Sequence, residues 1–145
     1  MKKHPSDSSE QQHAEGWLVE AFSKKLGVQM TKRRWQLEEG SWTELDAYST
    51  SPPILCEVWA HVGPPKGGQK HKVMTDAFKL LFVSSLVGSS ARRILLFGDQ
   101  EAAAYFRGES WMARALTQYG IEVEVVEFPP QLRGSIMEAQ ERQYR

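Results

Sequence analysis

Two acidic side chains lie in the interior of predicted strands, where apolar residues are the rule. Glu57 is inside the apolar run 54–60, and Asp46 is in the middle of the predicted strand 42–49. A buried carboxylate loses its hydration, so it needs a partner or a cation to stay ionised. Strands lie about 4.8 Å apart, so facing carboxylates can share one cation. Asp46 and Glu57 are therefore candidate ligands for Mg²⁺ or Mn²⁺, although ordinary acids on a solvated strand face would give the same pattern.

A polar stripe marks the helix predicted over residues 69–86. Gln69, Lys72, Asp76 and Lys79 recur at intervals of three or four residues, which places them on one face of an otherwise apolar helix. A lysine ammonium beside a reacting phosphate orients water and stabilises developing negative charge. The stripe is either part of a catalytic site or a plain solvated face, and we keep both interpretations.

The remaining pattern predicts one α/β domain with the order α-β-β-β-α-β-α-β. An apolar stripe predicts a first helix over residues 10–26, which Gly27 ends. Strands are expected within 28–37 and over 42–49, 54–62, 92–98 and 121–125, with one or two helices over 101–119. Three sequential strands and a helical crossover indicate a mixed sheet with helices on both faces.

Domain boundaries and strand faces follow from the same pattern. We expect a flexible N-terminus over residues 1–9, a single domain over 10–128 and a polar tail over 129–145. Strict alternation places Glu44, Asp46 and Tyr48 on one face of the second strand, with Leu45 and Ala47 on the other. On the third strand, it places Glu57 on the same face as Leu55 and Trp59.

The order of these elements and acids resembles the PD-(D/E)xK superfamily of restriction-endonuclease-like nucleases. The resemblance covers roughly residues 14–81 and implies a three-layer core. It rests on four short motifs: Gly16-Trp17-Leu18-Val19-Glu20, Glu44-Leu45-Asp46-Ala47-Tyr48, Ile54-Leu55-Cys56-Glu57-Val58-Trp59 and Gly68-Gln69-Lys70-His71-Lys72-Val73.

The resemblance implies a nuclease that hydrolyses phosphodiester bonds, with DNA as the expected substrate. Asp46 and Glu57 would hold one or two Mg²⁺ or Mn²⁺ ions, which activate water and clamp the scissile phosphate. Glu20, on the first helix, would be an accessory acid.

One position departs from the family pattern. Trp59 occupies the place of the family's strand lysine, and indole has one N–H donor and no charge. A lysine from the next helix would have to replace it, with Lys72 as first choice and Lys70 as second, beside Gln69. If no lysine reaches the carboxylates, the chain would be a catalytically inactive nuclease-fold protein that serves as a DNA-binding or scaffold subunit. These are the two competing functions.

Local basic clusters are the candidate nucleic-acid-binding residues. Lys32, Arg33 and Arg34 form one cluster, and Lys66 and Lys70 belong to another. Tryptophans near them in sequence would supply stacking platforms for bases, although exposed charge of this kind also serves solubility alone. A homodimer is a further expectation, with a contact through Trp111, Met112 or the tail.

Composition excludes several other classes. Lys and Arg number 18, as do Asp and Glu, so overall charge indicates no partner. Cys56 is the only cysteine, and we expect it to be a small buried hydrophobic residue. Residues 63–68 lack the phosphate-binding P-loop pattern, and the spacing of His61 and His71 is not that of a zinc site. With no apolar segment typical of a signal or a membrane span, we expect a cytoplasmic protein.

Overall fold

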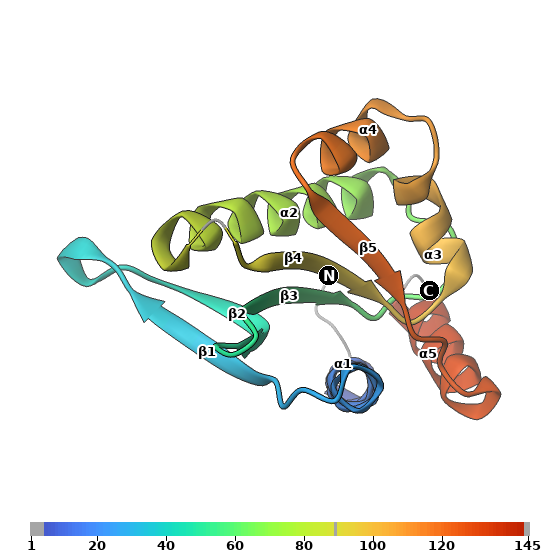
Figure 1. Cartoon of the computed structure of the whole chain (residues 1–145). Helices are drawn as coiled ribbons and strands as arrows, with labels where there is room; N and C mark the ends of the chain where they lie inside the picture. Colours follow the sequence, from blue (N-terminus) through green and yellow to red (C-terminus); the bar gives the residue numbers. More distant parts are fainter. Residues whose placement is uncertain (1–4, 89, 144–145) are drawn as a thin grey trace.

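A five-stranded mixed sheet forms the centre of the protein, whose computed structural model describes residues 5–88 and 90–143 (Figure 1). Its strands lie in sequence order across the sheet. β2 is antiparallel to both of its neighbours, β1 and β3, and β3, β4 and β5 are parallel. The mixed sheet and the expected order of elements up to β5 are confirmed, and a further helix follows β5. The strands are β1 (Thr31–Gln36), β2 (Trp42–Ser49), β3 (Ile54–Trp59), β4 (Arg92–Phe97) and β5 (Ile121–Val125).

Helices cover both faces of the sheet, as expected from the helical crossover after β3. The first face carries α2, α3 and α4, and the opposite face carries α1 and α5 (Figure 1). The helices are α1 (Pro5–Leu26), α2 (Gly67–Val87), α3 (Gln100–Ala104), α4 (Trp111–Gln118) and α5 (Pro130–Gln143), with short 3-10 turns η1 (Glu38–Gly40) and η2 (Tyr105–Arg107). No helix of these described segments is long and apolar enough to cross a lipid bilayer.

A separate apolar core lies on each side of the sheet, because the side chains of β3 alternate between the two faces. Leu55 and Trp59 pack in the core beneath α2, which also contains Leu80. Cys56 and Val58 pack on the opposite side, in the core that α1 covers. This confirms the predicted faces of β3. β4 is buried on both sides from residue 94 to 97, as expected for a central strand with a continuous apolar run.

A β-bulge in β2 corrects the predicted alternation of that strand. Thr31 pairs with Tyr48 and Arg33 with Leu45, so two residues of β2, Asp46 and Ala47, lie opposite one residue of β1. Leu45 and Tyr48 therefore share the core beneath α2, whereas Ala47 packs on the other side. Bulges bend a strand and re-aim a side chain, and they are common beside active sites. Here the re-aimed residue is Asp46.

Both ends of the described chain are more regular than the sequence suggested. α1 begins at Pro5, so helix covers part of the segment 1–9 that we expected to be flexible; residues 1–4 lie outside the described part. The expected polar tail contains α5, which buries Ile136 and Ala139. The Gln140 side chain accepts a hydrogen bond from Val62 N at 2.7 Å and donates one to Val62 O at 3.0 Å. The packed domain therefore extends well beyond residue 128.

Candidate active site

The two predicted carboxylates meet where β2 and β3 separate. Backbone pairing between these strands extends only to Ala47 and Cys56. Beyond that point each acid satisfies a backbone donor of the other strand. Asp46 N donates to Glu57 Oε1 at 3.0 Å, and Val58 N donates to Asp46 Oδ2 at 2.8 Å. The side chains thus replace the ladder hydrogen bonds, which explains how the sheet tolerates two acids at this place.

Lys79 of α2 contacts the buried acid directly. Its Nζ lies 2.9 Å from Glu57 Oε2 and donates a hydrogen bond to Glu44 O at 3.1 Å. Glu57 is only 3% exposed, whereas a third of the lysine side chain remains accessible. Burial lowers the pKa of Lys79, but the nearby acids, Glu57 first and then Asp76 and Asp46, together outweigh that effect, so the pKa rises. The site therefore keeps a permanent cation beside its most buried acid.

Asp76, one turn before Lys79, adds a third carboxyl group. It lies within hydrogen-bonding reach of Glu57, and burial raises its pKa. Burial, together with the nearby Asp46 charge, raises the pKa of Glu57 to about 8. Without a bound cation, the acids therefore retain a proton at neutral pH. A cluster that cannot fully ionise is one that a divalent cation would stabilise.

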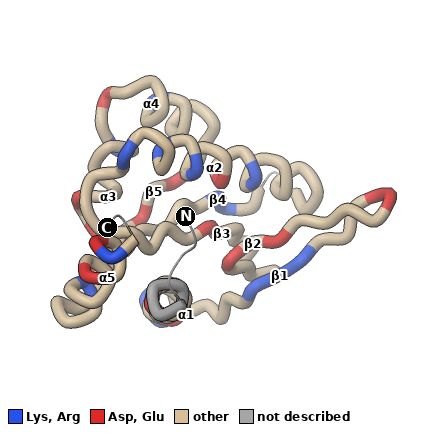
Figure 2. The backbone as a smooth tube through the Cα atoms, turned by 180° about the vertical axis from the view of Figure 1, so that it is seen from behind, with Lys and Arg blue, Asp and Glu red and all other residues tan. Residues whose placement is uncertain are grey.

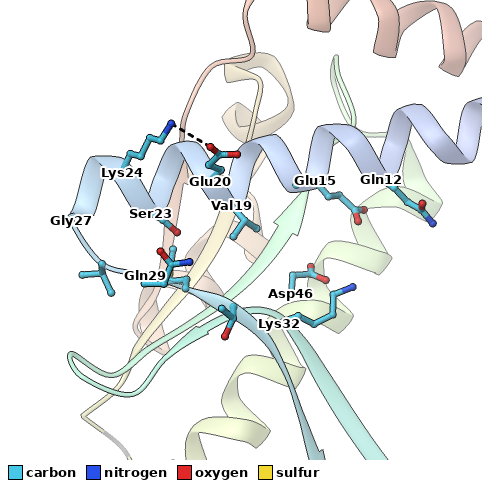
Figure 3. Close-up of a pocket in the computed structure, with 14 residues that line it drawn as sticks. Gln12, Glu15, Val19, Glu20, Ser23, Lys24, Gly27, Gln29, Lys32 and Asp46 are labelled. Carbon is cyan, nitrogen blue, oxygen red and sulfur yellow. Dashed lines mark ion pairs between the residues drawn. The ribbon is translucent and has the colours of Figure 1, made fainter.

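A groove of about 1100 Å³ runs between α1 and β1 and reaches Asp46 (Figure 3). Glu15 of α1 extends toward Asp46, as does Lys32 of β1. Burial and then the Asp46 charge raise the pKa of Glu15, and Lys32 opposes this shift. The groove gives the otherwise enclosed acids an opening to solvent.

Glu20, the predicted accessory acid, lies at the rim of this groove instead. Its side chain is 71% exposed and forms an ion pair with Lys24 at 3.3 Å (Figure 3). The acid of α1 whose pKa is raised by the Asp46 charge is Glu15, five residues earlier. Ala14, whose side chain is fully buried, fixes the helix orientation, and the residue after it faces the groove. The sequence motif favoured Glu20, whereas the structure places Glu15 beside Asp46.

The predicted lysines are near the site to different degrees. Lys72 is exposed and makes no ion pair within the described residues, but its charge acts on Glu15 and Asp76. The Lys70 ammonium lies over the Tyr105 ring, 4.1 Å from its centroid. The Gln69 side chain accepts a hydrogen bond from Lys66 N and caps α2. The structure therefore places Lys79, rather than Lys72 or Lys70, against Glu57.

The choice of Lys79 follows from the path of the chain. α2 begins beyond the carboxyl end of β3 and returns over the sheet, because a parallel strand, β4, follows it. A residue in the middle of the helix therefore lies above Glu57. The polar stripe itself carried this information, since Lys79 belongs to it, but sequence proximity to the strand pointed to the first turns.

Trp59, which the sequence resemblance placed where a strand lysine was expected, is part of the core. It is 5% exposed, and its ring lies 4.3 Å from that of His61. Its buried Nε1 has no hydrogen-bond partner among the described residues. Trp59 therefore supplies apolar packing beside the acids, and it leaves the cationic role to α2.

The candidate nucleic-acid-binding residues divide into two separate groups. Lys32, Arg33 and Arg34 are exposed on β1, whereas Lys66 and Lys70 lie at the start of α2. Figure 2 shows the basic segment of β1 on one side of the acidic segments of β2 and β3, and the basic segments of α2 on the other. The two groups thus flank the acids and do not form one cluster.

The segments named for a homodimer contact differ in their accessibility. Trp111 is 68% exposed, whereas Met112 is buried and cannot contact a partner. α5 already uses Ile136 and Ala139 for packing within the chain. The homodimer itself stays a prediction.

Comparison of the chain with protein-family models, curated proteins and solved structures finds no match. Its function must therefore be argued from the residues themselves.

Proposed function

We propose that this chain is a metal-dependent phosphodiesterase of restriction-endonuclease-like topology that acts on nucleic acid, with DNA as the expected substrate. The observation that carries the proposal is the contact of Lys79 with Glu57 beside the bulged Asp46. β3 has Trp59 where a lysine was expected, and that difference favoured an inactive protein. Lys79 of α2 supplies the missing cation. The mixed sheet and the two helical layers are compatible with that topology.

The donor set suits a hard divalent cation such as Mg²⁺ or Mn²⁺. Among the side chains that the structure describes, no group of three or more His, Cys, Asp or Glu is arranged to hold a metal ion. Mg²⁺, however, is commonly bound through one or two carboxylates plus water and substrate phosphate oxygens. Asp46 and Glu57 would be those ligands. The bound ion would polarise the phosphate and provide a nucleophilic water at neutral pH.

Lys79 would orient this water and stabilise the charge that develops on the phosphate. Its raised pKa makes it a poor base, so an electrostatic role fits better than proton abstraction. Lys72 and Lys32, farther out, would attract the phosphate backbone toward the groove. Glu15 would bind an outer water at the mouth of the site.

The test is cleavage of single-stranded, duplex and branched DNA, and of RNA, with Mg²⁺ or Mn²⁺. We expect activity that EDTA and Asp46→Asn abolish. Lys79→Ala should lower the rate about a hundredfold or more, since it removes a preorganised cation. Lys25→Ala is the control, an exposed lysine at the end of α1 that does not line the groove, and it should retain wild-type activity despite the same change of charge.

The competing function is that of a nuclease-fold protein that binds nucleic acid without cleaving it. One observation favours it: both oxygens of Glu57 are already engaged by protein donors, Asp46 N and Lys79 Nζ. In that case the cluster is purely structural. Absence of cleavage with either metal on every substrate, together with nucleic-acid binding by the wild type and a loss of stability in Asp46→Asn, would support this second function.

A further inference from the structure

The hairpin formed by β1 and β2 has an open, basic face next to the groove. Every residue of β1 is exposed except Trp35, which is half-buried. β2 pairs with β3 only over residues 47–49. The rest of the hairpin, from Asp46 to its tip, is not paired with β3 and projects from the body of the molecule (Figure 1). Lys32, Arg34 and Trp42 share one face of it, because Arg34 pairs with Glu44 and Gln36 with Trp42.

Trp42 and Arg34 form a stacked pair on this face. The Arg34 guanidinium lies 3.8 Å from the centroid of the Trp42 ring. Trp42 is nevertheless 51% exposed, although a large aromatic side chain normally gains by burial. The guanidinium thus holds the indole from one side while much of its surface remains open to solvent.

The opposite face of the hairpin gives this pair a rigid support. Trp35 packs edge-on against Tyr48, with ring centroids 5.0 Å apart. Arg33 lies over both rings, at 4.9 and 4.8 Å. Both tryptophans of the hairpin are therefore contacted by arginines, but Trp42 is exposed whereas Trp35 is half-buried.

We propose that this face, Lys32, Arg34 and Trp42, binds an unpaired nucleic-acid strand and leads it into the site at Asp46. The surface has the two features that single-strand binding needs, a basic track for phosphates and an aromatic ring on which a base can stack. Lys32 also lines the groove that reaches Asp46, so the track continues to the acids. The proposal rests on the proposed function for its connection to catalysis, but the binding surface is independent of it.

The exposed ring is the reason to prefer a single strand over a duplex. Within a duplex each base is covered by its neighbours, so an indole can stack only on a base that is unpaired or terminal. Lys32 and Arg34 are two residues apart on an extended strand, or about 6.6 Å, so they can contact successive positions along one backbone. Glu44 lies 3.7 Å from Arg34, and the acids of η1 bound the track at the hairpin tip.

The test measures binding alone, with EDTA present so that cleavage cannot occur. Fluorescence anisotropy compares a labelled single-stranded DNA, an RNA of the same sequence and the corresponding DNA duplex. We expect the single strands to bind more tightly than the duplex. Trp42→Ala should weaken single-strand binding about tenfold or more, and Trp42→Phe should retain most of it. Trp111→Ala is the matched control, an exposed tryptophan on α4, and should bind like wild type.

Two further measurements keep the outcome independent of folding defects. Arg34→Gln should weaken single-strand binding without removing an aromatic side chain. The quenching of tryptophan fluorescence by a single strand should disappear in Trp42→Phe. Duplex binding as tight as single-strand binding, or Trp42→Ala binding equal to that of Trp111→Ala, would overturn the proposal. Trp42-dependent binding without any metal-dependent cleavage would retain this inference and reject the proposed catalysis, and the reverse pattern would do the opposite.

Discussion

The fold strongly disfavours ionisation of Glu57, whose pKa it raises to about 8. It is 3% exposed, and it must share its surroundings with Asp46 and Asp76. Lys79 compensates only part of this cost, because the pKa of Glu57 still rises from 4.5 to about 8. The sequence did predict the pair of acids, since a carboxylate in an apolar run needs a special reason to be there.

This shift makes stability depend on pH in a defined direction. The folded protein binds the Glu57 proton more tightly than the unfolded chain, so its contribution to stability is complete below pH 4.5 and is lost as pH rises toward 8. Glu57→Gln removes this titration but keeps an oxygen that can accept from Asp46 N. We expect the stability of the variant relative to wild type to rise as pH increases from about 5 to 8, to a gain of a few kcal/mol, and to level off above pH 8.

Urea unfolding of both proteins at several pH values measures the difference. Glu20→Gln is a suitable control, because that acid is exposed at the rim of the groove. A difference between Glu57→Gln and wild type that does not change with pH would show that Glu57 is ionised throughout the range. The assignment of the retained proton to this cluster would then be wrong.

Residue roles were harder to predict than residue types. Glu15 and Glu20 are both glutamates of α1, but of these two only Glu15 extends toward Asp46, whose charge raises its pKa (Figure 3). Lys72 and Lys79 share one polar stripe, but only Lys79 reaches Glu57. In each case the helix was correctly predicted, and the relevant turn was not. Which turn faces a site depends on how the helix packs on the sheet, and a single helix pattern carries no such information.

At the level of elements, the bulge of β2 is the feature that the sequence pattern did not predict. Counting by twos along a strand assumes an unbroken ladder, so it assigned Tyr48 and Asp46 to one face. The bulge places Tyr48 in the core beneath α2 and frees Asp46 to accept a hydrogen bond from Val58 N. The error therefore marks the candidate site itself, in keeping with the frequent occurrence of bulges beside functional residues.

α5 was missed as a packed element for a different reason. Its composition is mostly polar, and only Ile136 and Ala139 are buried. The helix is held in part by specific hydrogen bonds. Gln140 bonds both backbone groups of Val62, and Arg133 donates to Asp99 Oδ1 at 3.0 Å. Such pairings join residues that are far apart in sequence, so no local pattern predicts them.

Gln140→Ala should therefore destabilise the protein despite the polar character of α5. The substitution leaves Val62 N and O without their partners in a part-buried place, which costs about 1–3 kcal/mol. Glu138→Ala, at an exposed position of the same helix, is the control and should cost little. Thermal or urea unfolding would measure both. Equal stabilities for the two variants would mean that α5 is anchored by its apolar contacts alone.

For the molecule as a whole, charge is balanced, with 18 basic and 18 acidic residues. Long-range attraction to a nucleic acid is therefore weak, and binding has to depend on local surfaces. The hairpin cations lie on one side of the acids and those of α2 on the other (Figure 2). A strand bound along the hairpin would use the first group only, which limits the number of phosphates it can neutralise.

This limit gives a quantitative expectation for the salt dependence of single-strand binding. Each neutralised phosphate contributes a slope of about −0.7 to a plot of log affinity against log salt concentration. Lys32 and Arg34, which share the binding face, would together give a slope of about −1.4, and even an added contact with Arg33 from the opposite face would bring it to no more than about −2. Arg34→Gln should make the slope about 0.7 less steep, whereas Arg114→Gln, with the same loss of charge on the exposed surface of α4, should leave it unchanged. Anisotropy titrations in EDTA over a range of salt concentrations provide the measurement.

A slope much steeper than −2 in the wild type, or an equal effect of the two arginine variants, would mean that the strand contacts cations beyond the hairpin. The α2 group, Lys66, Lys70 and Lys72, would then be the first to substitute.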